Sequence, residues 1–119
     1  EGPVLLARHK VDGEWPAWVQ QLTLPLLDGK LDLVSLFMLL AKQNINSVLV
    51  EAGPRLCGAL LDKGLVDELV LYQAPKLMGD EGRGLFHLPG LTRLFQAPKL
   101  NIKDVRMVGP DIRITARLA

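Results

Sequence analysis

A carboxylate followed by a glycine–proline turn is the part of this sequence best suited to chemistry. Glu51 directly follows the apolar run Val48–Val50, and Gly53 and Pro54 precede a second apolar stretch. Glycine allows close approach of the backbone, and proline suits the first position of a helix, where its missing N–H leaves no bond unmade. The first N–H groups of a helix have no partners within it and attract anions. The segment therefore predicts a phosphate site at a helix start, beside a carboxylate.

Two elements must hold this turn in place. We expect a buried strand over Ser47–Glu51, of the kind found in the centre of a parallel or mixed sheet, and a helix over Arg55–Lys63 with Gly64 as its C′ residue. Gly58 would leave room on the helix for the ligand. Two structural interpretations stay open: many such helix starts hold no ligand, and Glu51 could simply cap neighbouring backbone N–H groups.

Two familiar phosphate motifs are excluded by the residues themselves. Gly53 and Gly58 have the outer spacing of a Walker loop, but Ala59-Leu60 stands where that loop has its lysine and its serine or threonine. The segment Gly79–Gly84 has its glycines in the wrong order for a dinucleotide-binding fingerprint, and we expect a loop between strands there. A nucleoside triphosphatase is therefore not indicated.

The remaining apolar runs predict strands and one further helix. That helix begins after the N-cap Asp32, runs to about Gln43 and ends at Asn44, with a buried stripe at Leu33, Leu36, Phe37 and Leu40. We expect a loop at Val11–Pro16, a connector at Pro25–Lys30, and strands at Val4–Ala7, Trp18–Leu24, Glu68–Ala74, Leu91–Phe95, Leu100–Met107 and Asp111–Leu118. The last two should form an antiparallel hairpin. This order of elements predicts an α/β fold.

Composition limits the classes of partner. The chain has 119 residues, 49% of them hydrophobic, which is enough for the core of one small domain. Its 14 basic and 13 acidic residues give a net charge of +1 without a basic cluster, so no nucleic-acid surface is indicated. No apolar run is long enough to span a membrane. The single cysteine precludes an internal disulfide and agrees with a cytoplasmic location. A small-molecule ligand fits best.

Four motifs carry a resemblance to a known family. They are Val-Glu-Ala-Gly-Pro at 50–54, Gly-Leu-Val-Asp-Glu-Leu at 64–69, Ala-Pro-Lys-Leu-Met-Gly at 74–79 and Val-Gly-Pro-Asp at 108–111. From about Asp28 to its C-terminus the chain resembles the reductase domain of the bifunctional riboflavin-biosynthesis deaminase-reductase, which has a dihydrofolate-reductase-like mixed sheet with flanking helices. That family uses NADPH to reduce the ribosyl group of 5-amino-6-(5-phosphoribosylamino)uracil to ribityl.

The resemblance also implies roles for particular residues. It implies that Glu51 contacts the phosphoribosylaminopyrimidine substrate, and that NADPH binds to Gly53, Pro54, Arg55, Leu56, Cys57, Gly58 and Ala59. Cys57 is expected to pack rather than react, since hydride transfer needs no nucleophile and the cofactor supplies the reducing chemistry. No catalytic side chain is therefore assigned. No metal site is expected either, because neither His9 nor His87 is part of a zinc-deaminase signature and both are expected at surface or loop positions.

The extent of the resemblance leads to a further expectation. We expect residues 1–119 to be the C-terminal portion of a single NADPH-dependent reductase domain, without the deaminase domain or the first half of the reductase, and inactive alone. Unpaired sheet edges would then favour a homo-oligomer. Two alternatives remain open: a related dihydrofolate-reductase-like oxidoreductase with another substrate, and a non-catalytic oligomerisation module.

Overall fold

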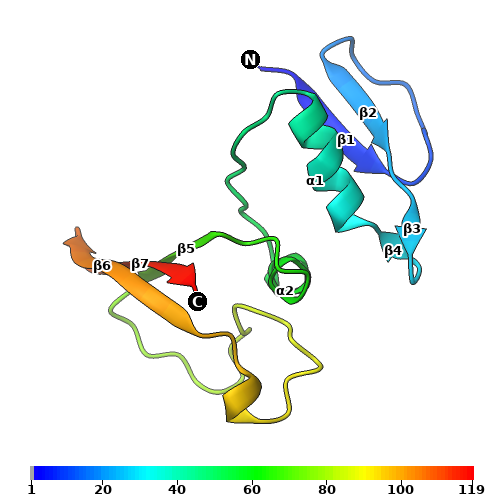
Figure 1. Ribbon diagram of the computed structural model, residues 1–119. Helices are drawn as coiled ribbons and strands as arrows, with labels where there is room; N and C mark the ends of the chain where they lie inside the picture. The colour runs from blue at the N-terminus through cyan, green and yellow to red at the C-terminus, as the bar shows by residue number, and fades with distance from the viewer. Residues whose placement is uncertain (1) are drawn as a thin grey trace. The chain divides into compact units, whose positions relative to one another are not determined.

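The computed structural model describes residues 2–119 and divides the chain into two compact units, Glu1–Leu49 and Val50–Ala119 (Figure 1). Within the described residues, the first unit contains two small strand pairs and one α-helix, and the second contains one α-helix, a short 3-10 turn and a three-stranded sheet. None of the helices in residues 2–119 has the length and apolar character needed to cross a membrane. Parallel and antiparallel strand pairs both occur together with helices, which confirms the predicted α/β class.

The first unit begins with two parallel strands. Strand β1 (Val4–Arg8) pairs with β2 (Val19–Thr23), so that Val4 lies opposite Val19. Both strands were predicted, and so was the loop between them. The buried side chains of this unit are Leu22 and Leu24, and Leu24 is only 1% exposed. These leucines form the centre of the unit's small core.

The predicted connector at Pro25–Lys30 is wrong, because a short hairpin occupies this part of the chain. Its strands are β3 (Leu26–Leu27) and β4 (Lys30–Leu31), which pair antiparallel. Asp28 and Gly29 turn the chain with φ angles of 52° and 73°. Asp-Gly is a strong signal for a two-residue hairpin turn with both residues at positive φ, and the sequence interpretation missed it.

Helix α1 (Leu33–Lys42) confirms the predicted helix and both of its ends. The Asp32 side chain accepts hydrogen bonds from the backbone N–H groups of Val34 and Ser35, at 3.0 and 3.4 Å. Asn44 follows the helix with a φ of 61°, a conformation that terminates helices and that asparagine tolerates well. The predicted stripe is only half-buried: none of the helix residues is fully buried.

The predicted strand at Ser47–Glu51 is wrong. None of the strands in residues 2–119 pairs with this segment, and the side chain of Leu49 is 82% exposed. The boundary between the two units falls within it, between Leu49 and Val50. An apolar run becomes a strand only when a neighbouring strand completes its hydrogen bonds, and that neighbour is not visible in a local pattern.

The second unit begins with helix α2 (Pro54–Asp62), which starts one residue before the predicted position. Gly64 follows its C-terminus at a φ of +66°, as predicted for a C′ glycine. Gly58 and Leu60 are its buried residues. Strand β5 (Glu68–Gln73) then confirms the next prediction.

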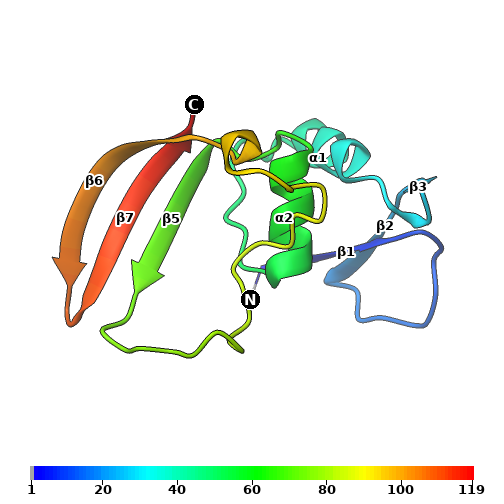
Figure 2. The ribbon, with the colours of Figure 1, turned by 90° about the horizontal axis from the view of Figure 1, so that it is seen from below.

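The sheet of the second unit has the order β5–β7–β6, with every pair antiparallel (Figure 2). Strands β6 (Leu100–Val108) and β7 (Asp111–Leu118) form the predicted hairpin, and Gly109 turns the chain at a φ of +58°. The pairing is interrupted by an irregularity between Ile102 and Asp104. Thus β7, the last strand in sequence, lies in the centre of the sheet.

The two faces of this sheet differ in character, because side chains alternate along each strand. Leu69, Leu71, Ile112, Ile114 and Ala116 share one apolar face, on which Ala116 is fully buried. The other face carries ion pairs: Glu68 with Arg117 at 3.5 Å, and Asp104 with Arg106 and Arg113 at 2.6 and 3.5 Å. Hydrogen bonds from Arg106 lower the pKa of Asp104 below its ordinary value.

The predicted strand at Leu91–Phe95 is also wrong. Its second half belongs to a 3-10 turn, η1 (Leu94–Gln96). The Gln96 side chain reaches back and accepts hydrogen bonds from the backbone N–H groups of Thr92 and Arg93, at 3.1 and 2.9 Å. These local bonds stabilise a turn in place of an extended strand.

Candidate functional site

The start of helix α2 lacks the usual side-chain cap. Gly53 is the N-cap residue, with extended backbone angles, and Pro54 occupies the first turn. The first helical hydrogen bond runs from the Cys57 N–H to the Gly53 carbonyl, at 3.1 Å. Among residues 2–119, no side chain caps this helix by a hydrogen bond, and its first turn contains no acidic residue. The positive end of the helix dipole is therefore available to an anion.

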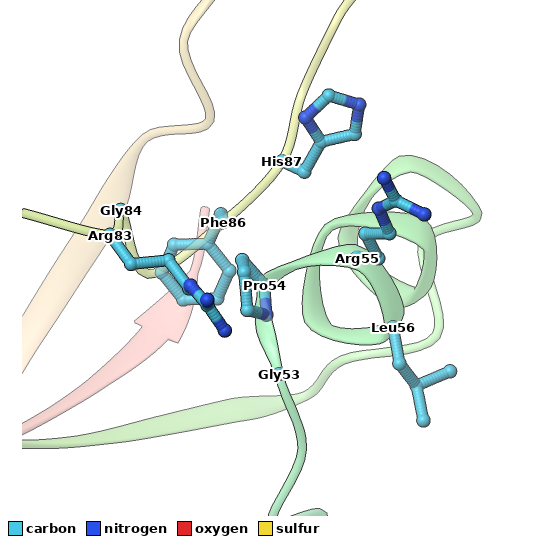
Figure 3. A pocket seen from close by; sticks show the side chains of 8 residues that line it. All are labelled: Gly53, Pro54, Arg55, Leu56, Arg83, Gly84, Phe86 and His87. Atoms are coloured by element: carbon cyan, nitrogen blue, oxygen red, sulfur yellow. The ribbon is translucent and has the colours of Figure 1, made fainter.

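An open pocket of about 720 Å³ lies at this helix start (Figure 3). One wall comes from the helix start, and the other comes from the long loop that follows β5. The lining residues are Gly53, Pro54, Arg55 and Leu56 on the first wall, and Arg83, Gly84, Phe86 and His87 on the second.

The pocket lining has two charged side chains, Arg55 and Arg83, and both are cationic. Arg55 and Arg83 are exposed, and neither forms an ion pair with any of the residues 2–119. Figure 3 shows Arg83 extending toward Pro54, while the Arg55 side chain is directed to the side on which His87 lies. Guanidinium groups form strong, charge-assisted hydrogen bonds to phosphate oxygens. The donor set of this pocket is thus suited to phosphate groups.

The loop wall is attached to the helix by its main chain. The His87 N–H donates to the Pro54 carbonyl at 2.9 Å. A Cβ atom placed on Gly58 would overlap the carbonyl oxygen of His87 and would lie 2.8 Å from its carbonyl carbon. The space at Gly58, which the sequence interpretation assigned to a ligand, is therefore filled by the loop.

The structure brings together part of the predicted set of cofactor residues. Gly53, Pro54, Arg55 and Leu56 line the pocket, whereas Cys57, Gly58 and Ala59 do not. The Cys57 thiol donates to the Ala52 carbonyl at 3.3 Å. Glu51, the predicted substrate contact, is exposed and lies outside the lining, two residues before Gly53. The roles assigned to these residues stay predictions.

The sequence interpretation missed the loop wall. Arg83 and Gly84 lie within the segment Gly79–Gly84, which was interpreted only as a loop, and His87 was assigned a surface or loop position. An arginine between two glycines was a weak signal for ligand contact. The proximity of His87 to Gly58 has no local signal, because the two residues are far apart in sequence. Across residues 2–119, no group of three or more His, Cys, Asp or Glu side chains is arranged to hold a metal ion.

Comparison with protein families and curated sequences gives one consistent result. The family model described as "RibD C-terminal domain" matches residues 1–114. The riboflavin biosynthesis protein RibD of Escherichia coli is 54% identical over 112 residues, which are 93% of this chain and 30% of that protein. The 5-amino-6-(5-phosphoribosylamino)uracil reductase of Buchnera aphidicola subsp. Acyrthosiphon pisum is 34% identical over 115 residues, which are 96% of this chain and 56% of that protein. The chain therefore spans about a third to a half of these relatives.

Solved structures agree with this result. A RibD structure from Acinetobacter baumannii matches with a TM-score of 0.77 and 29% identity, over 98% of this chain and 31% of that one. The riboflavin biosynthesis reductase Rib7 of Saccharomyces cerevisiae matches with a TM-score of 0.74 and 25% identity, over 99% of this chain and 56% of that one. The α/β fold is therefore that of riboflavin-pathway reductase domains.

Proposed function

Because the chain belongs to the RibD C-terminal domain family, we propose that it forms the cofactor-binding part of a 5-amino-6-(5-phosphoribosylamino)uracil reductase. The observation that carries this proposal is the uncapped start of α2, which opens into a pocket whose charged lining residues are Arg55 and Arg83. The relatives named as RibD or as the uracil reductase support the same reaction class. The proposed role of this chain in the reaction is to bind and orient the cofactor.

NADPH is the proposed cofactor, and it would supply the hydride that converts the ribosyl group into ribityl. The phosphate groups of a dinucleotide match the donors of this pocket. The free N–H groups at the helix start would bind one phosphate, because the helix dipole favours negative charge there. Arg55 and Arg83 would add charge-assisted hydrogen bonds from the two walls. These contacts would hold the cofactor so that its nicotinamide is presented to the substrate.

Glu51 is the proposed substrate contact. Glu51 precedes Ala52, whose carbonyl accepts a hydrogen bond from the Cys57 thiol of α2. The Glu51 carboxylate is exposed and can accept hydrogen bonds from hydroxyl groups. In a catalytically competent reductase that contains residues 1–119, Glu51→Gln should weaken substrate use more than NADPH binding. Steady-state kinetics together with NADPH titration separates the two effects, and an equal loss of both would indicate a structural role instead.

Self-association is proposed from a separate observation. On the edge strand β6, the side chains of Leu100, Ile102, Val105 and Met107 are 44%, 63%, 57% and 63% exposed. An exposed strand edge with apolar side chains favours association with another chain. A homo-oligomer is therefore expected in sedimentation, with or without cofactor. A monodisperse monomer would contradict this proposal and would remove the main support for an oligomerisation module.

Calorimetric titration of the chain with NADPH and with NADH tests the proposed cofactor role. Saturable binding with NADPH preferred is expected. Absence of saturable NADPH binding would contradict the proposal that this helix start and loop hold the cofactor. Inorganic phosphate serves as the control titration, because it should compete with NADPH for the same donors and bind more weakly.

A further inference from the structure

The main chain of the pocket loop crosses α2 at the helix's single glycine. Gly58 is buried, and its α-carbon faces the His87 backbone. A Cβ atom at this position would overlap the His87 carbonyl oxygen and would lie 2.8 and 2.9 Å from the His87 carbonyl carbon and nitrogen. Backbone atoms cannot move aside as the end of a flexible side chain can. Any side chain at this position must therefore displace the loop or the helix.

A second contact holds the loop on the same side of the helix. Pro54 lies four residues before Gly58, so the two residues share one helix face. The Pro54 carbonyl accepts from the His87 N–H at 2.9 Å. The loop is thus attached at His87 by a hydrogen bond and by close packing. Both Pro54 and His87 also line the pocket, so this attachment lies at the edge of the proposed cofactor site.

We propose that Gly58 is a positioning residue for the nucleotide cofactor and acts through the main chain of His87. Its missing side chain lets the loop pack on α2, and this packing places Arg83 and His87 opposite the helix start. The role differs from a direct contact, because Gly58 is not part of the pocket lining. The inference rests on the proposed NADPH site and identifies what keeps its second wall in place.

The variant Gly58→Ala tests this role. Alanine favours a helix interior more than glycine does, so α2 itself gains helix propensity and any loss must come from the contact with the loop. The matched control is Gly90→Ala, in the same long loop, where a Cβ atom would meet nothing within 4 Å and φ is not in the left-handed region. Two quantities are compared for each protein: the hydrogen-exchange rate of the His87 amide and the NADPH affinity by calorimetry. Far-ultraviolet circular dichroism shows whether each variant folds.

We expect Gly58→Ala to accelerate His87 amide exchange and to weaken NADPH binding, each by about tenfold or more, which corresponds to about 1.4 kcal/mol. Gly90→Ala should change neither quantity more than about twofold, which is within the range of ordinary surface substitutions. Unchanged His87 exchange in Gly58→Ala would overturn the positioning role. Faster exchange with unchanged NADPH affinity would overturn it as well.

A measurement on the unsubstituted chain decides the question if Gly58→Ala does not fold. NADPH binds preferentially to the state in which the loop is attached, so saturating NADPH should slow exchange of the His87 amide. Unchanged exchange at saturation would overturn the inference. Failure of the positioning role can be distinguished from failure of the proposed function. If the proposed function fails, the unsubstituted chain binds no NADPH at all, and Gly58 has no cofactor to position.

Discussion

The helices α1 and α2 start in opposite ways. At the start of α1, the Asp32 carboxylate accepts from the Val34 and Ser35 N–H groups and also from the Ser35 hydroxyl, at 2.8 Å. At the start of α2, the N-cap residue is Gly53, which has no side chain, and the first turn carries a cation, Arg55. The same backbone groups are thus satisfied internally in one helix and left available in the other.

The missing cap makes the start of α2 less stable but leaves it able to bind an anion. Asparagine, aspartate and serine are better N-cap residues than glycine, and a cation near the first turn is disfavoured by the helix dipole. The start of α2 is therefore the less stable of the two without a ligand. Pro54 and Arg55 line the pocket, so an anion bound there would satisfy the free N–H groups and offset the unfavourable charge. The helix start without its own cap is the one that is suited to binding.

The largest effect is expected when α2 is given the kind of cap that α1 has. Gly53→Asp introduces no strain, since Gly53 has a φ of −74° and a Cβ atom would meet nothing within 4 Å. The new carboxylate should occupy the free N–H groups and repel phosphate. We expect NADPH affinity, measured by calorimetry, to fall about 10- to 100-fold, the range expected for the loss of one charge-assisted hydrogen bond of about 1.5–3 kcal/mol.

Gly53→Asn is the control for this variant, because it supplies a cap of the same shape without the charge. It should weaken NADPH binding less than Gly53→Asp does. Both variants should raise the thermal midpoint of the unliganded chain slightly. NADPH affinity within about twofold of the original for Gly53→Asp would contradict the assignment of the α2 start as a phosphate site.

A smaller effect is expected when the cap of α1 is removed. Asp32→Ala leaves the N–H groups of Val34 and Ser35 without their acceptor, and the free energy of unfolding should fall by about 1 kcal/mol, within a range of about 0.5–2 kcal/mol. Urea unfolding followed by circular dichroism measures this change. Asp32→Asn should retain most of the stability, and NADPH affinity should not change in either variant. A loss of NADPH affinity in Asp32→Ala would show that the two helix starts are not separate in function.

The smallest effect is expected at Arg55. Arg55→Ala removes an exposed cation, so NADPH affinity should fall only about two- to fivefold, as for an exposed ion pair worth about 0.2–1 kcal/mol. Without ligand, the same variant should be more stable by about 0.3 kcal/mol, since the cation opposes the helix dipole. Arg55→Lys should behave almost like the original protein in both measurements. An Arg55→Ala variant that binds NADPH with unchanged affinity at low salt would remove Arg55 from the site.

The elements that were predicted correctly have their causes close by in sequence. Asp32 caps the helix that follows it, Gly64 ends α2, and Gly109 turns the chain between β6 and β7. Each of these signals acts within a few residues, so the pattern alone reveals it. The hairpin at Asp28-Gly29 was equally local and could have been predicted from the same type of signal.

The predictions that failed depend on partners outside the local pattern. The apolar residues Val48–Val50 have the composition of a strand, but pairing depends on a neighbouring strand. For the same reason, the sequence predicted only one wall of the pocket. The second wall depends on the packing of His87 on Gly58, and this contact joins two segments that no motif connects.

The most direct test of the central claim follows the backbone amide resonances of the chain during titration with NADPH. We predict saturable shifts at the start of α2, at Arg55 and Leu56, and in the loop at Arg83 and His87. The amides of Val34 and Ser35 at the start of α1 should not shift, because Asp32 already occupies them. Shifts at both helix starts, or shifts confined to residues outside the pocket, would contradict the claim that the uncapped start of α2 holds the cofactor.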